Sequence, residues 1–209
     1  MVNERELKFS TQLEGEPNAA ELERSLAAAG FDLGPAARVY NKDRYFDDAR
    51  LSLSRAGLAL RRRMTDGEVV ATLKTRGRVE GALHEREEIE LPMEGREWPR
   101  PILDRIETIT APGMVQTHTI IETERVRYAV LEAGRPAAVL AFDSVTARTP
   151  HAERTVGFTE VEIEAHGPTG IDTLERIAGA VDGVVPLTAN STTKLERVRQ
   201  LLMFGGWDE

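Results

Sequence analysis

The sequence contains no cysteine, which excludes disulfide bonds, thiolate metal sites and cysteine nucleophiles. Its four histidines are not paired at helix or strand spacing, so a histidine-rich zinc site is not expected. No run approaches the ~18 consecutive apolar residues of a membrane span, and the segment from Met1 to Glu6 lacks the apolar stretch of a secretory signal. We therefore expect a soluble cytoplasmic protein without a membrane partner, whose chemistry depends on carboxylates, arginine, lysine and hydroxyl groups.

Lysine is scarce, although the chain is rich in charge. Of the 27 basic residues only four are lysines (Lys8, Lys42, Lys74 and Lys194), and all the others are arginines. The 35 acidic residues give a formal net charge of −8, which argues against nucleic acid as a partner. Because a compact ammonium and a planar guanidinium bind anions differently, the positions that retain lysine are candidates for a functional site.

Alternating polar and apolar residues predict a mostly antiparallel sheet. We expect strands at residues 4–14, 38–47, 58–64, 69–75, 84–91, 117–130, 137–147 and 156–165, with Asp66-Gly67 as a hairpin turn. Helices are expected at residues 17–30, 102–109, 171–181 and 193–203. A sheet of seven or eight strands tends to curl or close, so we predict one α+β domain, residues 1–209, built on a barrel-like sheet.

The predicted strands carry charge on one face and apolar residues on the other. Residues i and i+2 of a strand point the same way, so the sets that share a face are Glu4, Glu6 and Lys8; Arg61 and Arg63; Thr72 and Lys74; Arg86, Glu88 and Glu90; Arg125 and Arg127; and Glu160, Glu162 and Glu164. These faces are either the solvated side of a sheet or the interior of an inverted barrel whose apolar outer faces are covered by helices. Glu122 and Glu124 break the register of Arg125, which predicts a bulge there.

Enclosure of these faces would have a chemical consequence. Two like charges about 7 Å apart repel by about 0.6 kcal/mol in water and by about 2.4 kcal/mol at an effective dielectric constant near 20. Enclosed glutamates therefore need a cation, and enclosed arginines need a polyanion. Carboxylates for Mg²⁺ or Mn²⁺ beside arginine and lysine for phosphate oxygens are what a metal-bound polyphosphate requires.

Glu4-Arg5-Glu6-Leu7-Lys8 is an E-x-E-x-K motif, and further motifs follow it in order along the chain. They lie at residues 43–47, 57–63, 72–75, 81–86, 124–128, 142–143, 160–164 and 191–194. Through this series the chain resembles the CYTH family, also called triphosphate tunnel metalloenzymes, which includes inorganic triphosphatases, thiamine triphosphatases and class IV adenylate cyclases. The resemblance implies an eight-stranded antiparallel β-barrel, or tunnel, with a polar interior and helices packed outside.

The resemblance also implies residue roles. One or two Mg²⁺ or Mn²⁺ ions would be held by Glu4, Glu6, Asp143, Glu160 and Glu162. The triphosphate would be bound by Lys8, Arg61, Arg63, Lys74, Arg86, Arg125, Arg127 and Lys194. Catalysis would fall mainly to Glu4, Glu6, Lys8 and Lys74. The implied reaction is the metal-dependent hydrolysis of tripolyphosphate to pyrophosphate and phosphate.

Several alternatives remain open at this point. Residues 74–88 look most like the inorganic triphosphatase branch. No group of aromatic or Asn/Gln side chains is placed to recognise adenine or thiazolium. Thiamine or nucleoside triphosphates are the next substrates to consider, followed by cyclisation of ATP. Two further alternatives are not enzymes: a polyphosphate-binding module that uses the same tunnel, and a lipocalin-type barrel with an apolar interior. The expected partner is a small triphosphate or polyphosphate, and a homodimer is left open.

Overall fold

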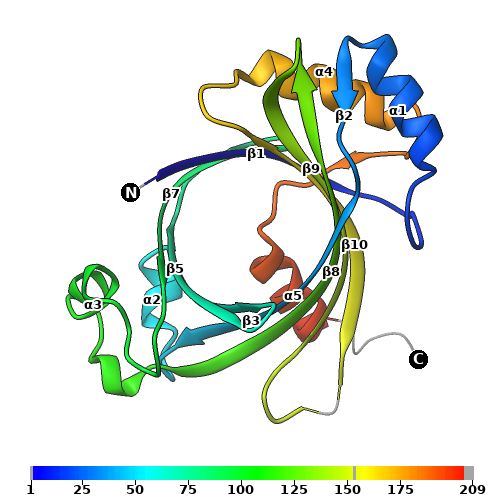
Figure 1. Ribbon diagram of the computed structural model, residues 1–209. Coiled ribbons are helices and arrows are strands. Elements are labelled where there is room, and N and C mark those ends of the chain that lie inside the picture. The colour runs from blue at the N-terminus through cyan, green and yellow to red at the C-terminus, as the bar shows by residue number, and fades with distance from the viewer. Residues whose placement is uncertain (1, 153, 205–209) are drawn as a thin grey trace.

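The computed structural model describes residues 2–152 and 154–204, in which eight antiparallel strands close into a barrel. Figure 1 looks along its axis. Around the ring the order is β1 (Val2–Ser10), β10 (Val156–Ala165), β9 (Arg135–Arg148), β8 (Gln116–Glu132), β3 (Ala37–Asp47), β4 (Leu58–Thr65), β5 (Glu68–Thr75) and β7 (Leu83–Pro92). Pairing of β7 with β1 completes the ring. The predicted α+β barrel is therefore confirmed.

Helices and short strands accompany this ring. The helices are α1 (Ala19–Ala28), α2 (Ser52–Arg55), α3 (Arg100–Ile106), α4 (Ile171–Asp182) and α5 (Lys194–Phe204), with the 3-10 turn η1 (Pro112–Met114). Three short strands, β2 (Phe31–Leu33), β6 (Arg78–Glu80) and β11 (Thr188–Ala189), pair with β8, β7 and β1. In the part of the chain described, no helix is long and apolar enough to cross a membrane. The predicted single domain extends over residues 1, 153 and 205–209, which lie outside the described residues.

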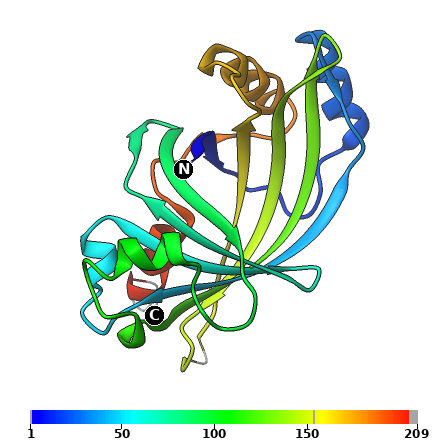
Figure 2. The same ribbon diagram turned by 60° about the vertical axis from the view of Figure 1, so that its left-hand side comes forward.

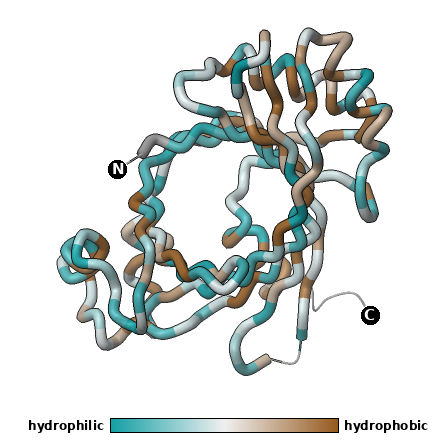
Figure 3. Tube along the Cα trace, viewed as in Figure 1, coloured by the Kyte–Doolittle hydropathy of each residue, from teal (hydrophilic) through white to brown (hydrophobic). Residues whose placement is uncertain are grey.

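Apolar strand faces point outward and are covered by helices. Leu7 of β1 and Ile163 of β10 are buried in one cluster with residues of α1 and α4. Leu60 of β4 and Leu73 of β5 are buried in a second cluster with residues of α2 and α3. Figure 2 shows β8, β9 and β10 reaching beyond the ring toward α1 and α4, and Figure 3 shows hydrophilic and hydrophobic residues interspersed along the barrel strands. Because neighbouring residues of a strand face opposite ways, the charged faces point into the barrel.

The helix α5 covers one end of the barrel interior. Its residues Leu195 and Val198 pack in a cluster with Tyr45 and Val145. Val145 lies two residues after Asp143 on β9 and so shares its inward face. The apolar stripe of α5 is therefore buried against the inner wall of the barrel, and the N-terminus of α5 is held close to the charged interior.

The bulge expected near Glu122 and Glu124 is not found. The register of β8 with β3 and β9 runs without a break from Glu122 to Arg127. Both glutamates lie on the opposite strand face from Arg125, and Glu122 pairs with Lys42 at 2.6 Å. The irregularities of β8 pairing lie instead opposite Tyr45 and Phe46 and at Val130, so the alternation of Glu122 and Arg125 reflects the outer and inner faces of a regular strand.

Candidate functional site

The barrel encloses a cavity of about 660 Å³ lined mainly by charged side chains. All eight predicted phosphate-binding residues line it, namely Lys8, Arg61, Arg63, Lys74, Arg86, Arg125, Arg127 and Lys194. Of the predicted metal ligands, Glu4, Glu6 and Glu162 also line the cavity, and Asp143 and Glu160 are buried beside Glu162. A lipocalin-type apolar interior is thereby excluded, because the inner wall carries ion pairs.

One group of ion pairs joins β1 to β5 and β7. Glu4 stands opposite Arg86 in the register of these strands. Its carboxylate accepts hydrogen bonds from Lys74 Nζ at 2.8 and 2.9 Å and from Arg86 Nε at 2.7 Å, and Arg86 Nη2 donates to Glu6 at 3.0 Å. Burial raises the pKa of Glu4, but Lys74 and Arg86 outweigh burial and lower that pKa to about 2. Glu4 and Glu6 are thus held next to the cations that are candidates for phosphate binding.

A second group gathers three buried carboxylates from β9 and β10. Glu160 stands opposite Asp143, and Glu162 follows on the same face, so that ligand oxygens of all three lie within 4.8 Å of one another. Arg125 donates to Asp143 at 2.8 and 2.7 Å and also pairs with Glu162. Lys8 Nζ donates to Glu162 at 2.6 Å and lies 3.2 Å from Glu6, so it connects the two acidic groups.

The carboxylate of Glu160 fits a divalent cation. It is 1% exposed, and neither of its oxygens accepts a hydrogen bond within residues 2–152 and 154–204. Lys194 Nζ lies 3.0 Å from Oε1 but without hydrogen-bond geometry. Burial raises the pKa of Glu160, whereas Lys194, Lys8 and Arg125 hold the pKa of Glu162 well below its usual range against burial. Oxygen ligands in this arrangement are suited to hard cations such as Mg²⁺ or Mn²⁺.

A third group fixes the arginines of β4. Asp43 stands opposite Arg63 and accepts two hydrogen bonds from it at 2.8 Å each, and Arg61 Nη1 lies 3.6 Å from Asp43. Arg61 also donates to Thr72 at 3.0 Å. Burial raises the pKa of Asp43, but the two arginines dominate and lower it to about 2. Sequence reasoning assigned Asp43 no role, because only the strand register shows that it faces Arg63.

Further cations lie at the cavity rim. Arg127 is exposed, and the described residues give it no ion pair or hydrogen bond. Arg76, Arg78 and Arg199 also line the cavity, and the sequence assigned them no role, because the first two lie between the expected strands 69–75 and 84–91 and the third lies on an expected helix. Arg199 lies on α5 and donates to Ser54 at 2.9 Å. The positive lining therefore extends beyond the eight predicted residues.

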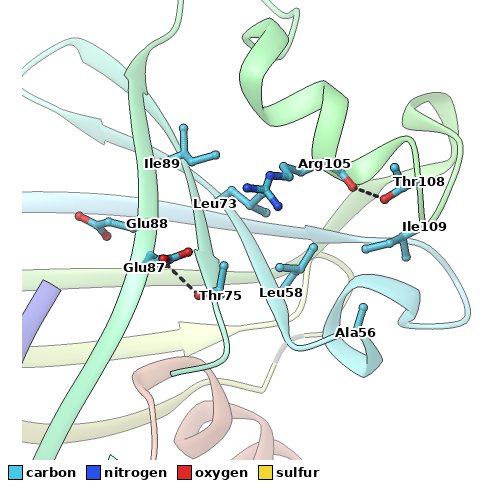
Figure 4. A pocket seen from close by; sticks show the side chains of 10 residues that line it. All are labelled: Ala56, Leu58, Leu73, Thr75, Glu87, Glu88, Ile89, Arg105, Thr108 and Ile109. Atoms are coloured by element: carbon cyan, nitrogen blue, oxygen red, sulfur yellow. Dashed lines mark hydrogen bonds between the residues drawn. The ribbon is translucent and has the colours of Figure 1, made fainter. Parts of the chain in front are cut away.

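A smaller cavity of about 180 Å³ lies against the outer faces of β4, β5 and β7, next to α3 (Figure 4). Leu58, Leu73, Ile89 and Ile109 give it a mainly apolar lining, with Arg105 as its cation. Glu87 and Glu88 also line it, but the group of three carboxylates that could hold a metal ion within the described residues lies in the interior. The charged cavity inside the barrel is therefore the candidate functional site.

Comparisons with known proteins agree with this geometry. A model of the CYTH domain matches residues 3–193. HpAC1 from Hippeastrum, a candidate adenylyl cyclase described as having a dominant triphosphatase activity, is 21% identical with a TM-score of 0.60, over 94% of this chain and 95% of that chain. A candidate adenylate cyclase from Bacillus halodurans is 15% identical with a TM-score of 0.57, over 94% and 98%. The Mimivirus capping enzyme triphosphatase is 14% identical with a TM-score of 0.52, over 87% and 89%. No sequence among the curated proteins matches the chain. At these identities the three structures show a shared fold.

Proposed function

The chain belongs to the CYTH family, and on that premise we propose that it hydrolyses tripolyphosphate to pyrophosphate and phosphate in a metal-dependent reaction. One observation carries the proposal. The barrel cavity is lined by eight predicted lysine and arginine side chains and by Glu162, which belongs to a buried trio of carboxylates with Asp143 and Glu160. Carboxylates bind divalent cations and the basic side chains bind phosphate oxygens, so the cavity offers both halves of a metal–triphosphate complex.

The basic side chains would bind and orient the triphosphate. Arg61 and Arg63 are fixed by Asp43, so their guanidinium groups are ordered before a substrate arrives. Lys8 and Lys74 extend from β1 and β5 into the same cavity and hold the carboxylates of Glu162 and Glu4. A polyanion gives these cations additional negative partners, and pre-ordered donors lose little entropy when it binds.

The carboxylates would complete the reaction centre. Asp143, Glu160 and Glu162, joined by Glu4 and Glu6, would hold one or two Mg²⁺ or Mn²⁺ ions. Such ions, when bound, neutralise phosphate oxygens and make a bound water more acidic. In the proposed hydrolysis a water oxygen would bond to the terminal phosphorus, the bridging P–O bond would break so that pyrophosphate leaves, and the water proton would pass to a carboxylate of the cavity. This chemistry depends on positioning and charge, so neither serine nor histidine needs to act as a nucleophile.

The cavity lining favours an inorganic substrate over a nucleotide. Tyr45 and His84 supply the aromatic rings of the described lining, and they are only 8% and 2% exposed. His84 Nε2 is also held by the carbonyl oxygen of Asn190 at 2.9 Å. Neither ring offers an open face on which adenine or thiazolium could stack. Two of the compared structures, from Hippeastrum and Mimivirus, are described by a triphosphatase activity, which agrees with a triphosphate as the substrate.

Phosphate release from tripolyphosphate, thiamine triphosphate and ATP, measured in parallel, tests this proposal. We expect release from tripolyphosphate with Mg²⁺ or Mn²⁺, slower release from the other two compounds, and none in excess EDTA. Metal-independent release would contradict the proposed reaction, and faster turnover of ATP or thiamine triphosphate would contradict the proposed substrate. Tight tripolyphosphate binding by calorimetry without phosphate release would identify a binding module, and cyclic AMP formed from ATP would identify a cyclase.

A further inference from the structure

The three buried carboxylates share one cation of the protein itself. Lys194 Nζ lies 2.6 Å from Asp143, 3.0 Å from Glu160 and 3.6 Å from Glu162. These are the same three residues whose ligand oxygens lie within 4.8 Å of one another. The Lys194 side chain is 9% exposed, so bulk water screens its charge little. Its ammonium therefore contacts every carboxylate that a cation bound to the trio would contact.

The backbone of Lys194 is anchored. Thr193 donates from its amide and its hydroxyl to Glu196, at 2.8 Å each, which caps the start of α5. Upstream, the backbone N–H of Asn190 donates to the carbonyl oxygen of Lys8 at 3.0 Å, and downstream Val198 is buried against the inner barrel wall. The ammonium can therefore leave the carboxylates by rotation of its four-carbon stem, while α5 stays in place.

We propose that Lys194 competes with the divalent cation for the Asp143–Glu160–Glu162 trio. The ammonium neutralises the trio in the metal-free protein and must withdraw when a metal ion binds, because two cations in contact with the same oxygens repel each other. The inference rests on the metal site of the proposed function and adds an order of events to it. Lys194 lines the cavity, so once displaced it can turn toward phosphate oxygens, and metal binding prepares the site for the triphosphate.

Lysine NMR of the unaltered protein tests the displacement directly. The chain has only four lysines, so a protein labelled with ¹³C at the lysine ε-carbon gives few signals, and the Lys194→Arg variant assigns the one of interest. We expect saturating Mg²⁺ to shift the Lys194 signal toward the position of a solvent-exposed lysine. Lys42 is the internal control, because it pairs with Glu122 on the outer face and should not shift. An unchanged Lys194 signal at Mg²⁺ saturation would overturn the inference.

Metal affinity without substrate gives a second test. Mn²⁺ binding, followed by the electron paramagnetic resonance signal of the free ion, should be at least about tenfold tighter in Lys194→Met than in the unaltered protein. Lys42→Met removes one lysine elsewhere and should bind Mn²⁺ as the unaltered protein does. Equal or weaker binding by a folded Lys194→Met variant refutes the competition, and if that variant does not fold, the NMR titration decides. Phosphate release is assayed separately, so a failed competition in an active triphosphatase refutes only this inference.

Discussion

Replacing Asp43 with asparagine tests the charge pairing inside the barrel, because the substitution keeps the shape of the side chain and removes its charge. Asp43 is 1% exposed and accepts two hydrogen bonds from Arg63 at 2.8 Å each. Arg61, which is also buried, lies 3.6 Å away. In the variant, two guanidinium groups lose their shared anion and an amide hydrogen atom points at one of them.

The magnitude follows from the pKa of the carboxyl group. Arg61 and Arg63 overcome the effect of burial and lower the Asp43 pKa from 3.8 to about 2. A pKa lowered that far corresponds to about 2 kcal/mol of stability in neutral solution. Removing one partner of a buried pair costs roughly 3–5 kcal/mol in other proteins, since the other charge stays buried. We therefore expect Asp43→Asn to lower the free energy of unfolding by about 2–4 kcal/mol.

The sign of the pH dependence is fixed by the same shift. A carboxyl group whose pKa is lowered in the folded protein stabilises it fully when the pH is above the pKa of the unfolded state. This stabilisation is lost as the pH falls through the folded-state pKa, which is about 2 for Asp43. Because the folded-state and unfolded-state pKa values of Asp43 both lie below about 4, the difference in unfolding free energy between the unaltered protein and Asp43→Asn should stay constant between about pH 5 and about pH 8.

Urea unfolding followed by circular dichroism measures this difference, with Asp104→Asn as the matched control. Asp104 pairs with Arg100 at 2.6 Å, but the two side chains are 56% and 68% exposed. An exposed pair contributes little, so the control should change stability by less than about 0.5 kcal/mol. The reasoning would be refuted if the two substitutions lowered the free energy of unfolding equally, or if Asp43→Asn lowered it by less than about 0.5 kcal/mol.

Three further predictions concern packing, substrate binding and pH. A Cβ at Gly77 would lie 1.8 Å from the carbonyl oxygen of Glu85, so Gly77→Ala should lower the free energy of unfolding, measured with urea, by at least about 2 kcal/mol. Gly113 has open space around it, so Gly113→Ala should change that free energy by no more than about 0.5 kcal/mol. Arg61→Ala should raise the KM for tripolyphosphate at least about tenfold with a smaller change in kcat, and an unchanged KM would remove this guanidinium from the binding site. Burial lowers the pKa of His84, so the stability that depends on His84 should fall as the pH drops below its ordinary value of 6.5, whereas the raised pKa of Glu164, about 7, acts in the opposite direction. The measurement is therefore the difference in unfolding free energy between the unaltered protein and His84→Gln, and a difference that stays constant from about pH 7.5 to about pH 5.5 would contradict the prediction.

The strands and their charged faces could be predicted because the signals are local, whereas the inward direction of the charge came from the family resemblance. Glu4, Glu6 and Lys8 alternate with Leu7 and Phe9, and a period of two assigns each set to one face of a strand. The apolar set requires a cover, which the amphipathic helices supply. The short elements β2, β6, β11 and α2 were missed, because a few residues are too short to establish a period.

The partners inside the barrel could not be predicted, because they depend on register between distant strands. Asp43 faces Arg63 through the pairing of β3 with β4, and Glu160 faces Asp143 through the pairing of β10 with β9. A shift of one residue would turn either side chain to the opposite face. The helix carrying Lys194 was expected from its apolar stripe, but its burial against the inner wall follows from the closure of the whole barrel.

The central claim is that the buried carboxylates inside the barrel act on a metal-bound triphosphate. Its most direct test is Mg²⁺- or Mn²⁺-dependent phosphate release from tripolyphosphate by Glu162→Gln, compared with Glu122→Gln on the outer face of β8. We predict that Glu162→Gln retains its circular dichroism spectrum and loses at least about 100-fold in rate, while Glu122→Gln keeps full activity. Full activity in Glu162→Gln would contradict the account.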